Sequence, residues 1–265
     1  IVEGFLAAAS GPADEWAIAR QYLTEEFAEE WDPNAGVIID ALDERRFDEL
    51  SETQVAVTLT PLATVDATGA YATADPGAIP LEFQLVARSD GELRISRAPA
   101  GVVLDEDLFE SATVYRSYAL MYFDPTWRYL IPDARWFPAT NPATRIAHAL
   151  IDGTPSPWLD GAVASAFPAD VELESQAVPV SGGTARVALD AAALQVEPLT
   201  LDRMQTQLEE SLATAAIPAV TMSVDGTSLD AERVSTSSTR VDTLPLVETA
   251  EGWGFLTGAG VEVLQ

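Results

Sequence analysis

The run YRSYALMYFDPTWRYLIPDARWFPATNPATRIAHALIDGTPSPWLD, residues 115–160, decides how the chain is divided. Apolar residues alternate over 118–122, a second β-rich run covers 127–131, and Asp124-Pro125-Thr126 lies between them. Aspartate and proline favour a turn there, so the pattern predicts a β-hairpin. Three of the six tryptophans also fall in this stretch, which we interpret as the start of a second domain.

A helix is expected directly after this hairpin. Asn141 is a favourable N-cap, and Pro142 is tolerated next because its missing N–H would have no intrahelical acceptor. Gly153 is a residue that readily adopts the left-handed conformation at a helix end. Helical spacing predicts that one face is buried, made of Ala143, Ile146, Ala147 and Leu150.

Five segments resemble the LpqB family of actinobacterial lipoproteins, whose central module is related to the spore-germination GerM domain. The resemblance to that module rests on DPTWRYLIPDARWFP (124–138), NPATRIAHALIDG (141–153), PSPWL (155–159) and LDRMQTQLEESLATAAIPAVTMSVDG (201–226). GFLAAASGPADEWAIARQYLTEEFAEEWDP (4–33) is similar to the family's N-terminal domain. The resemblance covers most of the chain, and its segments follow the family's order.

Length and resemblance together predict two domains and a tail. A chain of 265 residues favours about two domains, since one domain usually holds roughly 100–200 residues. We place an N-terminal domain at 1–112, a GerM-like (GerMN) domain at 113–226, and a connector with a C-terminal hairpin at 227–265. A β-propeller follows this module in the family, so the hairpin either begins a propeller or pairs with one of the two domains.

In the first domain, helices are expected before strands. One helix is predicted over 2–9 and another from Asp14, with Trp16, Ala19, Tyr22 and Leu23 on its buried face. Thr24 is placed to cap a short continuation that ends at Trp31-Asp32-Pro33.

The predicted strands of the first domain follow these helices. Alternation indicates strands over 53–59 and 81–88, with Ala87 facing inward, and Asp90-Gly91 predicts a hairpin back into Leu93 and Ile95. Helices followed by antiparallel strands indicate an α+β fold. We expect a cone of the nuclear-transport-factor type (NTF2-like), in which helices cover the concave face of a curved antiparallel sheet.

The rest of the second domain alternates strands with one clear helix. A strand from Val171 is predicted to return through a turn at 181–183, and a later strand covers 220–224. Thr200 is expected to cap the intervening helix, whose apolar stripe is Leu201, Met204, Leu208, Leu212 and Ala215. These elements predict a small α/β sandwich with two helices on one face of a sheet, and the resemblance implies that it is a GerMN domain.

The charge of the chain excludes some partners. Its 42 acidic and 14 basic residues give a formal net charge of -28, and every basic residue is arginine. Such a field repels phosphate backbones and anionic lipid headgroups, so we expect no nucleic-acid partner and no direct membrane docking. The acidity either keeps an exported domain soluble or steers a basic partner toward it.

The sequence carries no recognisable catalytic, cofactor-binding or metal-binding pattern. Cysteine is absent, and the single histidine, His148, lies between alanines on the helix expected after Asn141. One imidazole without thiols does not make a typical zinc site, and serine-hydrolase and nucleotide-binding motifs are missing. The acidic run at 105–110 fits the first turn of a short helix better than a calcium loop. We therefore expect no enzymatic activity, no cofactor and no metal.

The candidate binding residues are aromatic side chains interleaved with arginines. This composition is typical of the centres of protein interfaces and of sugar-stacking platforms, but alternating aromatic residues on a hairpin are also typical of a core. The set is therefore either an exposed binding surface or packing between domains. Its members are Trp127, Arg128, Tyr129, Arg135, Trp136, Phe137 and Trp158.

The resemblance implies a function outside the cytoplasm. Members of the family are lipid-anchored and act with MtrB, the sensor histidine kinase of the MtrAB two-component system, in cell-envelope homeostasis. This sequence begins at Ile1 without a signal peptide, and the resemblance implies that an export signal and a lipid-bearing cysteine lie upstream and have been removed. No window approaches the roughly 18–20 apolar residues of a membrane helix. Binding of a cell-wall glycan or peptide is the alternative function.

Overall fold

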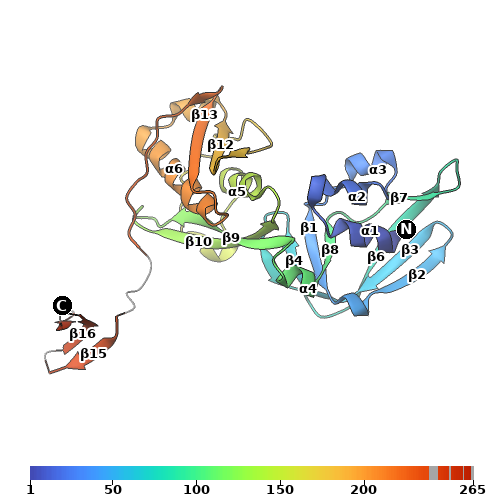
Figure 1. Ribbon diagram of the computed structural model, residues 1–265, viewed down its shortest axis with the longest axis horizontal. Coiled ribbons are helices and arrows are strands. Elements are labelled where there is room, and N and C mark those ends of the chain that lie inside the picture. The colour runs from blue at the N-terminus through green and yellow to red at the C-terminus, as the bar shows by residue number, and fades with distance from the viewer. Residues whose placement is uncertain (239–243, 251, 259, 264–265) are drawn as a thin grey trace.

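The computed structural model describes residues 1–238, 244–250, 252–258 and 260–263 (Figure 1). The first part of the chain carries four α-helices and eight strands within 1–110. The helices are α1 (Val2–Ala9), α2 (Ala17–Arg20), α3 (Glu25–Glu30) and α4 (Glu106–Glu110). The strands are β1 (Gly36–Asp40), β2 (Arg46–Ser51), β3 (Gln54–Leu59), β4 (Pro61–Asp66), β5 (Tyr71–Thr73), β6 (Ile79–Ala87), β7 (Leu93–Arg97) and β8 (Val102–Asp105).

Helix α1 forms where its apolar spacing predicts, and its buried residues are Val2, Phe5, Leu6 and Ala9. The expected second helix is broken, because Asp14, Glu15 and Trp16 all have positive φ angles, of 48°, 54° and 60°. A left-handed backbone cannot continue a right-handed helix, so only α2 is regular. The Thr24 hydroxyl does accept a hydrogen bond from the Phe27 N–H and caps α3.

Two four-stranded sheets form the β-structure of this part. Their orders are β5-β4-β1-β8 and β2-β3-β6-β7. Strand pairs are antiparallel except β1 with β8, a parallel pair that the sequence pattern did not predict. In β6, Leu81, Phe83 and Leu85 are buried, but Ala87 at the end of the strand is exposed, contrary to expectation.

The second part of the chain begins with the predicted hairpin. Its elements are β9 (Tyr115–Phe123), β10 (Leu130–Pro138), α5 (Pro142–Ile151), β11 (Val180–Ser181), β12 (Thr184–Leu189), α6 (Pro198–Ala213), β13 (Ala219–Val224) and β14 (Thr227–Ser228). Strand β10 starts three residues later than predicted, because Trp127 has a φ of 61° and belongs to the turn. The turn therefore spans 124–129.

Both long helices differ from expectation at their ends. Asn141 precedes α5 but has a φ of 53° and makes no capping hydrogen bond with its side chain, and Gly153 is not left-handed. Helix α6 starts at Pro198 with Glu197 as N-cap residue, one turn before the predicted cap Thr200. The buried faces are as predicted at Ala143, Ile146, Ala147 and Leu150 in α5 and at Met204, Leu208 and Leu212 in α6.

These helices lie between two β-layers. One layer is the hairpin β9–β10, and the other is the sheet β11-β12-β13-β14, in which β12 and β13 are parallel (Figure 1). Helix α6 contacts both β9 and β13. The strands therefore form two sheets around the helices, whereas the sequence predicted a single sheet with helices on one face. The predicted α+β class is confirmed.

The segment after β14 is anchored along α6. Leu229, Ala231 and Val234 pack against the second core, and the Val234 N–H donates to the Thr206 hydroxyl at 2.9 Å. The Ser237 N–H donates to the carbonyl of Arg128 at 2.7 Å, which ties this strap (residues 229–238) to the tip of the β9–β10 hairpin. The remainder of the predicted connector, 239–243, lies outside the described residues.

A small sheet follows, made of β15 (Leu246–Thr249), β16 (Gly252–Thr257) and β17 (Gly260–Val263). It contains the predicted C-terminal hairpin, of which Ala259 and Leu264 lie outside the described residues. Its strands pair with one another in the order β15-β16-β17.

Buried apolar residues form two separate clusters. One lies within 2–115 and the other within 118–224. Trp136, from the second part of the chain, packs against the first cluster. Within the residues that the structure describes, no helix is long and apolar enough to cross a membrane.

Candidate functional site

The structure places the predicted aromatic and arginine residues in three separate locations. Trp127, Arg128 and Tyr129 lie at the tip of the β9–β10 hairpin. The Trp127 ring packs 5.2 Å from the ring of Phe123, and the guanidinium of Arg203 lies 4.0 Å above it. Arg128 is exposed and lies 5.9 Å from the Tyr129 ring centroid. Trp127 therefore packs partly into the second core.

The hairpin tip is organised by Asp124. Its carboxylate accepts hydrogen bonds from the N–H groups of Thr126, Arg128 and Tyr129 and from the Thr126 hydroxyl. The hydroxyl contact contributes most to lowering the Asp124 pKa to about 2, and the backbone N–H groups lower it further. Hydrogen bonds donated to a carboxylate favour its ionised form and so lower its pKa.

Arg135 lies at the joint between the two parts of the chain and is only 3% exposed. Its guanidinium donates to the Asp133 carboxylate at 2.8 Å and to the carbonyl of Thr154 at 3.0 Å. The same guanidinium donates to the carbonyl and hydroxyl of Thr68, in the β4–β5 turn, at 3.0 and 2.8 Å. One buried side chain thus connects β10 to the first sheet.

Asp133 is the charge partner at this joint and is 1% exposed. It also accepts the N–H of Ser156 at 2.8 Å and the Ser156 hydroxyl at 2.7 Å. Tyr122, on the paired strand β9, is buried, and burial raises its pKa to about 12, with Arg135 opposing the rise. A buried pair is stable only when its remaining donors and acceptors are satisfied, which is the case here.

Trp136 and Phe137 pack the joint from the side of β10. The Trp136 ring lies 4.6 Å from Phe109 and 6.3 Å from Tyr71, both in the first part. The backbone N–H of Trp136 donates to the carbonyl of Gly69 at 2.8 Å. Phe137 is buried on the other side, 6.5 Å from Tyr118.

Trp158 differs from the other tryptophans of this stretch because it is 71% exposed. It sits in a 3-10 turn, Pro157–Leu159, directly after the anchored Ser156. Of the seven candidate residues, Arg135, Trp136 and Phe137 form the joint and three form the hairpin tip, and Trp158 is the one exposed aromatic residue among them.

Sequence reasoning missed the residues that complete the joint. Thr68 and Gly69 lie 67 positions before Arg135 and Trp136, and nothing in their local sequence marks them as contacts of β10. Ser156 and Asp133 lie inside the quoted stretch, but a polar network becomes visible only when the strand and the following turn are placed in space.

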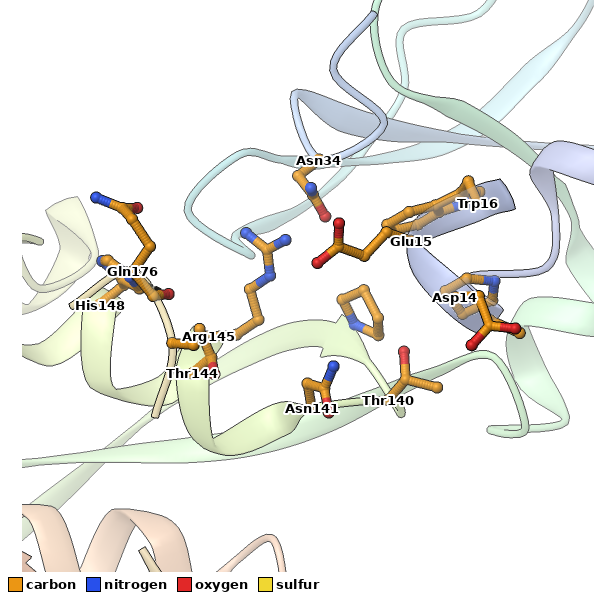
Figure 2. A pocket seen from close by; sticks show the side chains of 14 residues that line it. Asp14, Glu15, Trp16, Asn34, Thr140, Asn141, Thr144, Arg145, His148 and Gln176 are labelled. Atoms are coloured by element: carbon orange, nitrogen blue, oxygen red, sulfur yellow. Dashed lines mark hydrogen bonds between the residues drawn. The ribbon is translucent and has the colours of Figure 1, made fainter. Parts of the chain in front are cut away.

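A second candidate is a cleft of about 790 Å³ between the first part and α5 (Figure 2). One wall carries the left-handed segment 14–16 together with Asn34, and the other carries the start of α5. Figure 2 shows Glu15, Asn34 and Arg145 pointing into this space. The lining residues are 12–16, Asn34, Pro138, Thr140, Asn141, Thr144, Arg145, His148, Gln176 and Ala177.

The polar groups of the cleft are unevenly satisfied. His148 is held by Asp152 at 2.7 Å and the carbonyl of Gln176 at 3.2 Å. By contrast, the buried Oδ1 of Asn34 accepts no hydrogen bond from any residue that the structure describes. Groups of three or more histidine, cysteine or acidic residues able to hold a metal are absent from the described ranges.

Comparison with known proteins assigns both parts of the chain. "Lipoprotein LpqB, N-terminal domain" matches residues 1–110, and "Sporulation and spore germination" matches residues 119–230. The chain belongs to the LpqB lipoprotein family. The two matched ranges lie on either side of the joint that Arg135 and Trp136 form with the β4–β5 turn.

Relatives named Lipoprotein LpqB occur in several actinobacteria. The protein of Thermobifida fusca is 34% identical over 222 residues, covering 78% of this chain and 34% of that protein. The proteins of Mycolicibacterium smegmatis and Mycobacterium tuberculosis are each 29% identical, over 87% and 82% of this chain and 41% and 37% of their own lengths. The chain thus spans less than half the length of these relatives.

One solved structure is similar over part of the chain. "Tandem GerMN domains of the sporulation protein GerM from Bacillus subtilis" matches 53% of this chain and 58% of that chain, with a TM-score of 0.35 and 13% identity. A TM-score of this size is too low to support a fold assignment.

Proposed function

We propose that the chain is the adaptor part of a non-enzymatic, extracytoplasmic lipoprotein that binds the sensor domain of the MtrB histidine kinase. Through this contact it modulates MtrAB two-component signalling in cell-envelope homeostasis. An adaptor changes signalling only if it binds one conformation of the kinase more tightly than the other. The proposal extends the family assignment to a specific partner.

The observation that carries this proposal is the buried joint. Arg135 donates to Thr68 and Asp133, and the Trp136 N–H donates to Gly69, so the two domains are held by polar bonds and aromatic packing together. A partner that meets both domains then meets a surface of fixed shape. Preorganisation of this kind lowers the entropy lost on binding.

Trp158 is the side chain that we expect at the centre of the contact. Exposed tryptophans on rigid turns are frequent hot spots of protein interfaces, and Ser156 fixes this turn through Asp133. The net charge of -28 favours a basic surface on the partner. Association should therefore slow and weaken as salt screens the charges.

The test is calorimetric titration of the purified sensor domain into the whole chain. We expect a saturable isotherm that weakens with salt, and an affinity at least about tenfold lower for Trp158→Ala. Leu194→Ala is the matched control, since Leu194 is also exposed but lies in another turn. Absence of heat together with absence of co-elution at high concentration contradicts the proposal.

The names of the relatives support a location at the outer face of the cell membrane. We propose that the full-length protein is held there by a lipid on a cysteine upstream of Ile1. Metabolic labelling of the full-length protein with a fatty-acid analogue tests this anchor. Loss of the label on substitution of the upstream cysteine is expected, and a protein that is never labelled argues against it.

Binding of a cell-wall glycan or peptide is the second candidate function. The 71% exposed Trp158 favours it, because an indole face on a fixed turn is a suitable platform for stacking a sugar ring. Pull-down with insoluble peptidoglycan should retain the chain and lose it with Trp158→Ala. Retention of both proteins equally would exclude Trp158 as the platform.

A further inference from the structure

We propose that the cleft between the first domain and α5 binds a short zwitterionic peptide through its free carboxylate and free ammonium group. The proposal is independent of kinase binding, because it uses neither Trp158 nor the joint. The cleft volume of about 790 Å³ accommodates a peptide of a few residues. Three observations on its walls define the ligand.

The first observation is Arg145, an arginine whose charge acts on the buried Tyr115 and opposes the rise of that pKa, but which has no hydrogen-bond or ion-pair partner in the described part of the chain. Arg145 is partly buried and lines the cleft. Four other described arginines also lack a hydrogen-bond or ion-pair partner and a ring beneath them, but all of these are exposed: Arg46, Arg88, Arg97 and Arg186. An unpaired, partly buried guanidinium is suited to a carboxylate, which it can bind with two parallel hydrogen bonds.

The start of α5 adds to the same wall. The Asn141 side chain accepts no hydrogen bond from the first-turn N–H groups of this ten-residue helix. These groups and the helix dipole favour an anion beside Arg145. Arg145 and the start of α5 together offer a carboxylate a locally positive site, although the chain as a whole is strongly acidic.

The opposite wall, made of residues 14–16 and Asn34, favours a cationic group of the ligand. Asp14 and Glu15 form no ion pair within the described residues, and the buried Oδ1 of Asn34 lacks a hydrogen-bond donor. A buried acceptor without a donor destabilises the folded chain, and a ligand N–H that donates to it removes this cost. The Glu15 carboxylate and the Asn34 amide oxygen, which point into the same space, together suit an ammonium group (Figure 2).

The backbone holds both walls in an uncommon shape. Four of the eight described non-glycine residues with positive φ line the cleft, namely Asp14, Glu15, Trp16 and Asn141. The indole N–H of Trp16 donates to the carbonyl of Ala9 at 2.8 Å and fixes the segment. The buried Trp16 and Pro138 supply apolar surface for small ligand side chains. The two charged walls are therefore pre-formed and face a partly apolar floor.

The test uses trialanine, which offers both termini and small side chains. Amide chemical shifts of the whole chain are followed during titration with unblocked trialanine, N-acetyl-trialanine and trialanine amide. We expect saturable shifts around residues 14–16, Asn34 and 141–148 with the unblocked peptide, and binding weaker by about tenfold or more when either end is blocked. The amide is a cation that the acidic surface attracts, so its weaker binding would report the lost carboxylate contact.

Variants of each wall separate the two contacts. Arg145→Gln should abolish the discrimination against the amide, and Glu15→Gln should abolish the discrimination against the acetylated peptide. Arg186→Gln and Glu26→Gln are controls outside the cleft with the same charge changes. Absence of saturable shifts with unblocked trialanine overturns the proposal, as does unchanged binding to Arg145→Gln. A fall in stability of both variants without peptide binding would instead show that Glu15 and Arg145 clasp the domains directly.

Discussion

The ring of Phe137 lies against the α-carbon of Gly69, so close that a β-carbon on this glycine would approach Phe137 Cε1 to 2.6 Å. Gly69 has a φ of 82° and accepts the Trp136 N–H at its carbonyl. The joint therefore depends on a residue without a side chain at one position of the β4–β5 turn.

Gly69→Ala should weaken the joint more than its backbone strain alone explains. Gly91→Ala is a matched control, because Gly91 has a φ of 87° but open space around its α-carbon. Alanine at positive φ costs about 1 kcal/mol at either site, and the clash at Gly69 adds about 1–3 kcal/mol. Calorimetric unfolding of both variants measures the difference in stability. An equal loss of stability in the two variants would show that the β4–β5 turn and Phe137 shift to accommodate the added β-carbon at no cost.

Arg135→Met should destabilise the second domain by about 3–5 kcal/mol. It leaves the carboxylate of Asp133 buried without its cation and the carbonyls of Thr68 and Thr154 without a donor. Denaturant unfolding followed by tryptophan fluorescence measures the loss. Arg128→Met removes an exposed arginine of the same hairpin and should change stability by less than about 0.5 kcal/mol. A similar effect in both variants would contradict the role assigned to Arg135.

The Asp124 turn predicts a pH dependence at the acid end. The folded pKa of Asp124, about 2, lies below its ordinary value of 3.8, so the ionised carboxylate stabilises the folded chain. This contribution is complete above pH 3.8 and is lost as the pH falls through about 2.

Asp124→Asn should therefore flatten the stability profile between those two pH values, because an amide keeps one acceptor and does not titrate. Asp90→Asn is the control, since Asp90 caps its turn by accepting a single N–H, from Glu92. Carbon-13 NMR of the carboxyl groups gives the midpoint directly. A midpoint near the ordinary value for Asp124 would refute the assignment.

The two outer tryptophans should respond oppositely to truncation. Trp127→Ala removes a ring that packs on Phe123 and carries Arg203, so a loss of up to about 3 kcal/mol is expected. Trp158→Ala should change stability by less than about 0.5 kcal/mol, because its side chain is exposed. Thermal unfolding of both variants tests this, and a large loss for Trp158→Ala would place its ring in a contact.

Local sequence signals predicted the elements with strong periodicity. The buried stripes of α1, α5 and α6, the hairpin through Asp90-Gly91 and the short helix after Asp105 all rest on patterns that neighbouring residues determine. Strands β1, β2, β4, β5 and β8 were not predicted. Two of them, β1 and β8, pair in parallel across more than 60 residues, and no local alternation reports such pairing.

The candidate sites show the same limit. Composition drew attention to Arg135 and Trp136, but their contacts with Thr68 and Gly69 depend on tertiary placement. The cleft was not predicted, because the sequence places Asp14 and Glu15 at the start of a helix. In the structure Asp14, Glu15 and Trp16 are left-handed, and this segment forms a wall of the cleft instead. Arg145 has no local feature that distinguishes it from other helix arginines.

The strap at residues 229–238 determines which hydrogen bonds of the second domain bear a mechanical force applied to the C-terminal part of the chain. Because the Ser237 N–H is bonded to Arg128, the chain leaves the second domain at the hairpin tip and not at the end of β14. Tension would first load the bond between Ser237 and Arg128, then the bonds of Val234 and Glu232 to α6, before it reached the sheet. The hydrogen bonds of the strap would therefore break before those between β13 and β14, and the sheet would keep its strand pairing until the strap had detached.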